Sequence, residues 1–256
     1  MQLTDKVAII TGGASGIGAA CCRAFAAAGA LVAVVDRNAE GAEAVAAEVK
    51  GVGVACDVSD EASVNAMVAE VEDRLGPVDV LFNNAGVATG GDILATDPSV
   101  WDRQWGINVM AHVYAVRAVL PGMLERGSGY VLHTASMAGI LTTHGNATYA
   151  ATKHAVVGLA EWLAITYDHR GIKVSLLAPL GVRTPMLGDV DPERMSAVLG
   201  PIKEPEEVAA LVVDAIDEER FLILTDPIAQ TWMDRKAGDL ERWLRGMRRI
   251  QSQSFG

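Results

Sequence analysis

The chain has 256 residues, half of them hydrophobic, so it is long enough to bury a substantial core. Its net charge of −11 argues against a general nucleic-acid-binding protein, which normally presents a basic surface. No apolar run approaches the roughly 20 residues that a membrane-spanning helix needs, and the N-terminus carries no signal-peptide pattern. We therefore expect a cytoplasmic protein that binds neither nucleic acid nor a membrane.

The cysteines and histidines do not indicate a disulfide framework or a metal site. Cys21, Cys22 and Cys56 are odd in number, and two of them are adjacent in a predicted helix. We expect buried thiols in a reducing compartment. The histidine spacings fit no zinc pattern, so no metal is expected. His144, five residues before Tyr149, is a candidate substrate contact, whereas His133 is expected to pack within a strand.

Seven short apolar runs alternate with helix-length segments. In chain order they are Val7 to Ile10, Leu31 to Val35, Val52 to Ala55, Val78 to Phe82, Gly129 to His133, Val174 to Ala178 and Phe221 to Leu224. This alternation predicts an α/β fold: a doubly wound, Rossmann-type parallel sheet of seven strands with helices on both faces. No linker rich in Pro, Gly or Ser divides the chain, so residues 1–256 are expected to form a single domain.

A glycine-rich turn follows the first strand and precedes an alanine-rich helix. Its candidate cofactor-binding residues are Gly12, Ser15, Gly16, Ile17 and Gly18. Such glycines let the backbone turn tightly and approach a pyrophosphate, which binds to amide groups at the helix N-terminus. The Gly-x-x-x-Gly-x-Gly spacing is one residue longer than the commoner form. Any tight turn could use glycines, but the position between a strand and a helix favours dinucleotide binding.

An acidic residue ends the second strand. Asp36, 18 positions after Gly18, can accept hydrogen bonds from the adenosine ribose hydroxyls and would repel a 2′-phosphate. We therefore predict NAD rather than NADP. Arg37 could pair with a 2′-phosphate, but we expect it to point to solvent or to stack on the adenine.

Two further strand ends carry polar turns. Asp57 either accepts a hydrogen bond from the adenine amino group, with Val58 packing nearby, or only orders the start of the next helix. Asn84, Ala85 and Gly86 follow the fourth strand at the sheet edge where ligands bind in such folds. Turn chemistry alone would also explain them.

Tyr149 and Lys153 are four residues apart in a predicted helix and therefore share one face. A nearby ammonium favours the phenolate, so we expect it to lower a tyrosine pKa that is ordinarily about 10. Such a tyrosine can transfer a proton near neutral pH. Alone the pair is weak support, because Tyr and Lys meet at this spacing in many helices.

Taken together, these motifs resemble the single-domain branch of the short-chain dehydrogenase/reductase family. The matching elements, which cover residues 5 to about 186, are Thr11-Gly12-x-x-x-Gly16-x-Gly18, Asn83-Asn84-Ala85-Gly86, Asn108, Ser136, Tyr149-x-x-x-Lys153 and Pro179 through Thr184. The resemblance implies an NAD-dependent oxidoreductase that interconverts a secondary alcohol and a ketone. It also implies a homotetramer, and the apolar helix face around Gly158 and Trp162 is compatible with one.

The resemblance assigns a role to each central residue. Tyr149 is the general acid/base, and Ser136 holds the substrate oxygen by a hydrogen bond. Lys153 binds the nicotinamide ribose and lowers the pKa of the tyrosine, while Asn108 supports a water chain that relays the proton. Pro179, Val182 and Thr184 belong to the cofactor-binding set. A non-catalytic nucleotide sensor of the same fold is the alternative, but a sensor would not need all four central residues.

The sequence departs from the family in two places. Pro179-Leu180-Gly181 stands where the family usually has Pro-Gly, which puts the local backbone in question. Residues 227–250 read as one or two helices instead of a glycine-rich tail. Three placements of this tail are possible: over the active site, on the core, or against a neighbouring subunit. We prefer packing on the core. Its basic stretch from Arg235 to Arg249 is interpreted as an amphipathic surface helix rather than a phosphate- or membrane-binding patch.

By resemblance, substrate specificity is expected from a lid at about 185–204. Its apolar residues are interrupted by charged ones; the set is Met186, Leu187, Asp189, Asp191, Glu193, Arg194, Met195, Val198 and Leu199. Methionine-rich walls adapt to apolar ligands. With Val87, Ile140 and Leu141 as further pocket residues, the sequence predicts a medium-sized apolar alcohol or ketone as the substrate.

Overall fold

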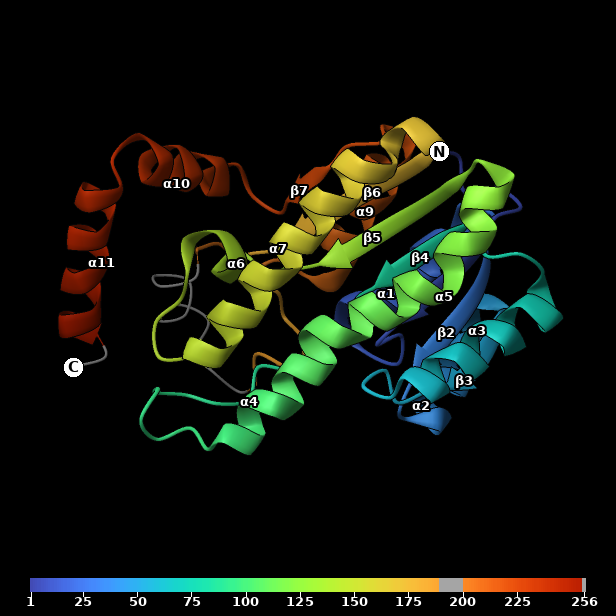
Figure 1. Ribbon diagram of the computed structural model, residues 1–256, viewed down its shortest axis with the longest axis horizontal. Helices are drawn as coiled ribbons and strands as arrows, with labels where there is room; N and C mark the ends of the chain where they lie inside the picture. The colour runs from blue at the N-terminus through green and yellow to red at the C-terminus, as the bar shows by residue number, and fades with distance from the viewer. Residues whose placement is uncertain (189–199, 255–256) are drawn as a thin grey trace.

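The computed structural model describes residues 1–188 and 200–254 and contains a seven-stranded sheet. The strands are β1 (Val7–Thr11), β2 (Leu31–Asp36), β3 (Val52–Ala55), β4 (Val80–Asn83), β5 (Gly129–Thr134), β6 (Ile172–Ala178) and β7 (Leu222–Leu224). Their order is β3-β2-β1-β4-β5-β6-β7, and every neighbouring pair is parallel (Figure 1). The predicted doubly wound sheet is confirmed.

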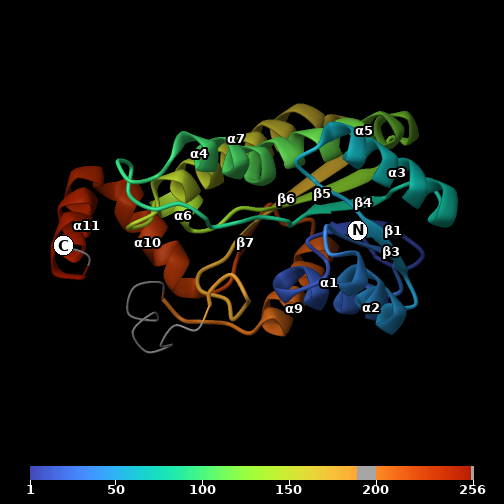
Figure 2. The same cartoon turned by 90° about the horizontal axis from the view of Figure 1, so that it is seen from below.

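Helices cover both faces of the sheet, as Figure 2 shows. One layer contains α1 (Gly16–Ala27), α2 (Ala39–Val49) and α9 (Pro205–Asp217), and the other contains α3 (Glu61–Leu75), α5 (Ala111–Arg126) and α7 (Ala147–Tyr167). Successive strand residues point to opposite faces, so Ile10 and Val34 pack under the first layer and Ile9 and Val35 under the second. Both faces are apolar because both are covered.

The segment from Pro98 to Arg126 is one continuous helical element. It comprises α4 (Pro98–Trp105), a π-helical turn (Gly106–Met110) and α5. By length and composition alone this segment could cross a membrane, contrary to the sequence expectation. However, Val116, Val119 and Met123 are buried in the core that α5 shares with the sheet. The helix is apolar because one of its faces packs inside the protein.

The C-terminal residues form two helices, α10 (Pro227–Gly238) and α11 (Leu240–Ser254). Helix α10 packs against β7 and the short helix α6 (Ala138–Leu141), where Ala229 is fully buried. Helix α11 follows α10 and lies at the end of the molecule farthest from β3 (Figures 1 and 2). The tail is therefore anchored through α10, and α11 extends from it.

Candidate active site

A pocket of about 1660 Å³ runs along the edge where the carboxyl ends of the parallel strands meet. From β1 the strands are added outward to β3 on one side, and from β4 they are added outward to β7 on the other side. The order of the strands therefore switches between β1 and β4, and ligands bind at such a switch point in open α/β sheets. The predicted residues that line the pocket are Gly12, Ser15, Gly16, Ile17, Asp36, Arg37, Asp57, Val58, Asn84, Ala85, Gly86, Ser136, Tyr149, Lys153, Pro179, Val182 and Thr184. Of the predicted site residues, Gly18 and Asn108 do not line it.

The glycine turn leaves room only for backbone. Gly12 and Gly16 have positive φ angles of 67° and 52°, which glycine adopts without strain. A Cβ on Gly12 would lie 3.0 Å from the Cα atom of Ala85, and one on Gly16 would lie 2.9 Å from Cγ2 of Thr184. A Cβ on Gly18 would lie 2.0 Å from the carbonyl oxygen of Gly12, so Gly18 permits close packing of helix and turn.

Asp36 ends β2 beside this turn. Its two carboxylate oxygens accept hydrogen bonds from the backbone nitrogens of Ala14, at 3.2 Å, and Asn38, at 3.0 Å. These bonds fix the carboxylate on the pocket wall, next to Arg37. Asp57 also lines the pocket, but its Oδ1 atom accepts from Ser59 N at 3.0 Å and from Ser59 Oγ at 2.6 Å. Asp57 thus orders the turn before α3, as one of the two interpretations predicted.

Asn84 joins three neighbouring strands. Its Nδ2 atom donates to the carbonyl oxygen of Thr11 at 3.0 Å, and its Oδ1 atom accepts from Thr134 Oγ1 at 3.1 Å. The hydroxyl of Thr11 in turn accepts from the backbone nitrogens of Asn84 and Ala85. The side chain of Asn84 therefore holds the ends of β1, β4 and β5 in register and positions Ala85 and Gly86 on the pocket wall.

Tyr149, Lys153 and Ser136 converge from a helix face and a strand end. Asn146 caps α7 by accepting from the backbone nitrogen of Tyr149 at 3.0 Å, and one turn later Lys153 lies on the same face. The Nζ atom of Lys153 lies 5.7 Å from the centroid of the Tyr149 ring and donates to the carbonyl oxygen of Thr134 at 2.8 Å. Ser136, two residues beyond β5, lies close enough to Tyr149 for its hydroxyl to favour the phenolate and so oppose the rise of the pKa.

Burial controls the proton affinity of this pair. It raises the pKa of Tyr149, against the effect of the hydrogen bond with Ser136, and it lowers the pKa of Lys153 to about 8. The expectation that Lys153 lowers the pKa of Tyr149 is therefore wrong for the chain by itself. The loss of hydration around a phenolate at this position outweighs the effect of Ser136, and Lys153 is not among the groups that shift this pKa.

Asn108 lies behind the pocket wall rather than in it. It is fully buried in the π-helical turn; its Oδ1 atom accepts from Val87 N at 2.8 Å, and its Nδ2 atom donates to Val87 O at 2.9 Å and to Thr152 Oγ1 at 3.1 Å. Asn108 therefore links the loop after β4 to α7. π-Helical turns are frequent at functional sites.

Comparison with known proteins identifies the family. The short chain dehydrogenase profile matches residues 6–195, which is most of the chain. This chain belongs to the short-chain dehydrogenase/reductase family. It is 33% identical over 244 residues to a 2,5-dichloro-2,5-cyclohexadiene-1,4-diol dehydrogenase of Sphingobium indicum, covering 90% of this chain and 97% of that protein. It is 36% identical over 233 residues to a meso-2,3-butanediol dehydrogenase of Serratia marcescens, covering 87% of this chain and 92% of that protein.

A solved relative has the same architecture. The crystal structure of a short-chain dehydrogenase/reductase from Burkholderia phymatum in complex with NAD matches with a TM-score of 0.86 and 30% identity, covering 94% of this chain and 96% of that one. The chain is thus a dehydrogenase/reductase of this family. Its own cradle fits a dinucleotide, because Cβ atoms at Gly12 and Gly16 would occupy the space between the turn and the opposite pocket wall.

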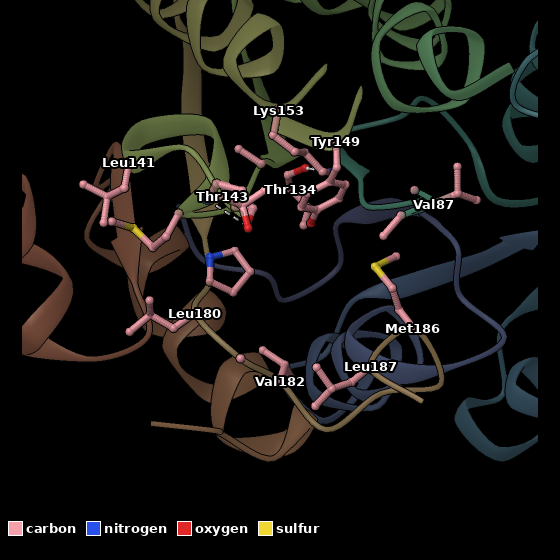
Figure 3. A pocket seen from close by; sticks show the side chains of 18 of the residues that line it. Val87, Thr134, Leu141, Thr143, Tyr149, Lys153, Leu180, Val182, Met186 and Leu187 are labelled. Atoms are coloured by element: carbon pink, nitrogen blue, oxygen red, sulfur yellow. Dashed lines mark hydrogen bonds between the residues drawn. The ribbon is translucent and has the colours of Figure 1, made fainter. Parts of the chain in front are cut away.

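The pocket wall opposite Tyr149 and Lys153 is apolar, as Figure 3 shows. Leu180 replaces the usual family glycine without a positive φ angle, and its backbone nitrogen donates to Thr225 Oγ1 at 3.1 Å. Leu180 itself lines the pocket, together with Val87, Leu141, Met186 and Leu187. Ile140 does not line it, contrary to prediction; it packs with the residues under α10, and its carbonyl oxygen accepts from Lys236. Asp189, Asp191, Glu193, Arg194, Met195, Val198 and Leu199 lie outside the described residues.

A buried histidine pair was missed by the sequence analysis. His133 lies in β5 as expected, and its Nδ1 atom is 2.8 Å from Nδ1 of His112 in α5. Burial lowers the pKa of both imidazoles, that of His133 to about 3, so both are neutral at ordinary pH. The two residues are 21 positions apart in the sequence, so no local pattern indicates their contact.

The C-terminal helices close one end of the pocket. Trp232 and Arg235 of α10 line it, as do Arg242, Trp243 and Met247 of α11. His144 also lines it, and its Nδ1 atom lies 2.8 Å from Oε1 of Gln251. The tail therefore packs on the core through α10, as preferred, and α11 lines the far end of the pocket.

Replacing Lys153 with methionine tests the effect of burial on its pKa. The folded-state pKa of about 8 lies below an unfolded value of about 10.4, so the unfolded chain binds more protons between these values and the contribution of Lys153 to stability rises with pH. We expect the unfolding free energy of the wild type minus that of Lys153→Met to rise by about 3 kcal/mol between about pH 7 and pH 10.5. Urea denaturation at each pH measures it, and a constant difference contradicts the assignment.

Proposed function

We propose that this chain is an NAD-dependent enzyme that interconverts a secondary alcohol and a ketone. The observation that carries the proposal is that Ser136, Tyr149 and Lys153 line the same pocket as the glycine turn. A proton-transfer group and a dinucleotide cradle in one pocket are the two requirements of carbonyl–alcohol interconversion. The relatives support it, because their names describe dehydrogenases of diols with hydroxyls on ring or internal carbons.

Tyr149 exchanges the proton of the substrate hydroxyl in this proposal. Ser136 and Tyr149 lie beside each other on the pocket wall, so a substrate oxygen placed between them would be held by one hydroxyl while it exchanges a proton with the other. When bound, NAD supplies the hydride acceptor, and the positive charge of its oxidised ring favours the phenolate. Lys153, with a pKa of about 8, can gain or lose a proton near neutral pH. Asn108 positions the loop and α7 through Val87 and Thr152.

The preference for NAD over NADP rests on Asp36. Its carboxylate is fixed on the pocket wall by two backbone donors and would repel a 2′-phosphate. Arg37 lines the same pocket and would attract that phosphate. We propose that Asp36 dominates, because its position is set by hydrogen bonds from Ala14 in the glycine turn and from Asn38.

The substrate in this proposal has a medium-sized apolar body. Val87, Leu141, Leu180, Met186 and Leu187 support it by lining the pocket near Tyr149 (Figure 3). Methionine adapts to ligands of irregular shape, and Met186 is 52% exposed beside the pocket.

Tyr149→Phe tests the chemistry. The substitution removes only the phenolic hydroxyl, so we expect kcat to fall by about three orders of magnitude or more while NAD affinity stays within about twofold. Alcohol-dependent NADH formation measures the first quantity, and calorimetric titration with NAD measures the second. Unchanged turnover would favour a different proton-transfer group or a non-catalytic role for the site.

Asp36→Ala tests the cofactor preference. With the carboxylate gone and Arg37 retained, we expect the ratio of kcat/KM with NADP to that with NAD to rise by about tenfold or more. Asp57→Asn is the matched control, because Asp57 lines the same pocket but should affect both cofactors alike. A wild-type preference for NADP would reject the assignment.

We also propose a homotetramer that acts in the cytoplasm. The surface of α7 supports the assembly, since Trp162 is 56% exposed and Ile165 81% exposed, with Gly158 on the same exposed side. A face with large exposed apolar side chains and a small residue is typical of helix pairing between subunits.

Trp162→Glu tests this assembly. A charge in the centre of an apolar contact is costly, so we expect the variant to elute as a smaller species than the wild type. Size-exclusion chromatography with light scattering measures the mass, and Glu161→Gln on the same helix is the control. An identical mass for wild type and Trp162→Glu contradicts this interface.

A further inference from the structure

The tail wall is the part of the pocket lined by α10 and α11. Its apolar members are Trp232, Trp243, Met247 and Ile250, and its cationic members are Arg235, Arg242 and Arg249. Amphipathic helices usually place cations in bulk solvent and apolar residues on the core. Here both kinds of side chain line the pocket that contains Tyr149.

The cations of the tail wall form no ion pair with the part of the chain that the structure describes. Within residues 1–188 and 200–254, no carboxylate lies within 4.0 Å of Arg235, Arg242 or Arg249. Asp239 and Asp234 line the same wall, but their carboxylates accept from the backbone nitrogen of Arg242 and from Gln230 Nε2. The nearby acids are thus engaged within the tail itself.

The tail is basic, although the protein as a whole is acidic. The protein as a whole carries a net charge of −11, whereas residues 227–254 contain six Lys and Arg against three Asp and Glu. A cationic wall on an acidic protein focuses attraction for anions at the pocket mouth.

The surface of α11 also carries no side chain between its two pocket arginines, where Gly246 faces open space. Gly246 lies four residues after Arg242 and three before Arg249, so the three share one side of the helix. A Cβ at Gly246 would meet no atom within 4 Å, although glycine destabilises a helix interior relative to alanine. The buried Nε1 atom of Trp243 has no acceptor among the described residues, which leaves a further donor on this wall.

We infer that the tail wall is a subsite for an anionic group of the substrate, a carboxylate or a phosphate. Guanidinium groups bind both oxyanions through paired hydrogen bonds. The inference rests on the proposed function and extends its substrate class: the alcohol or ketone is joined by an apolar body to an anion. The apolar body lies along Trp232, Trp243 and Met247, and the anion binds Arg242 and Arg249, with Arg235 contributing from α10.

Three matched substrates test the subsite with the full-length enzyme and saturating NAD. They are a decanoate with a hydroxyl on its penultimate carbon, the methyl ester of the same acid, and the corresponding alkyl phosphate. We expect kcat/KM for at least one anion to exceed that for the ester by about tenfold at low ionic strength, and the excess to shrink as salt is added. The favoured anion distinguishes carboxylate from phosphate recognition.

A pair of double variants identifies the responsible residues. Arg242→Ala with Arg249→Ala should lower the anion-to-ester ratio towards one. Arg245→Ala with Arg248→Ala removes the same charge from the same helix at positions that do not line the pocket, and should leave the ratio unchanged. Equal wild-type activity on anions and ester, or an equal loss of the ratio in both double variants, would overturn the subsite.

A binding measurement separates this inference from the proposed reaction. Calorimetry of the NAD-saturated wild type should show decanoate or decyl phosphate binding about tenfold more tightly than methyl decanoate, and the Arg242/Arg249 double variant should lose the difference. Such binding without any alcohol turnover would reject the reaction and retain the subsite. Turnover of the neutral ester, with no anion preference in either assay, would retain the reaction and reject the subsite.

Discussion

The hydrogen bond from Lys153 Nζ to the carbonyl oxygen of Thr134 is the constraint on which the active site depends. It joins the face of α7 to the end of β5 at 2.8 Å, in a buried position. Because Tyr149 lies one turn before Lys153 on the same helix, fixing the ammonium also fixes the phenol. Ser136 is only two residues beyond Thr134, so the same bond sets the separation of Tyr149 and Ser136. Helix α6 packs so closely on α7 that only glycine fits at position 139, where a Cβ would lie 2.4 Å from Lys153 O.

Burying this lysine costs stability and provides chemistry through one physical effect. Removing the ammonium from water lowers its pKa to about 8, so the folded protein at neutral pH holds a charge that its surroundings disfavour. The carbonyl of Thr134 compensates only in part. The same dehydration that destabilises the fold thus brings the pKa of Lys153 closer to neutral pH, as the proposed reaction would require. In the proposed reaction Tyr149 would need an additional positive charge for the same reason, since burial alone raises its pKa.

The parts of this protein that were predictable from sequence are those fixed by local pattern. Apolar runs gave all seven strands because each strand is covered on both faces, and the glycine turn follows from steric limits at Gly12, Gly16 and Gly18. Contacts between distant segments were not predictable: the His112–His133 pair and the orientation of Ile140 towards α10 depend on how helices pack. The prediction of a lowered pKa for Tyr149 was wrong for a related reason. Helical spacing indicates that Lys153 is a neighbour, but it does not indicate how deeply the phenol is buried. No local sequence pattern indicates the π-helical turn that contains Asn108.

The pocket wall built from strand ends and the wall built from α11 differ in how strongly they are held. The wall built from strand ends is rigid, since residues such as Asn84 and Thr11 hydrogen-bond across strands, and a change there would disturb the sheet. Helix α11 packs mainly on α10. It contacts the body through Trp243, which packs on the apolar cluster beside α6, and through the contact of Gln251 with His144, and most of its other side chains are exposed. Substitutions on α11 at positions other than Trp243 therefore change the pocket without removing buried contacts of the core, and distant sites of this kind contribute almost independently to stability. Substitutions in the appended helix α11 can therefore change which ligands the pocket binds, while the sheet and α7 keep Tyr149, Lys153 and Ser136 in place.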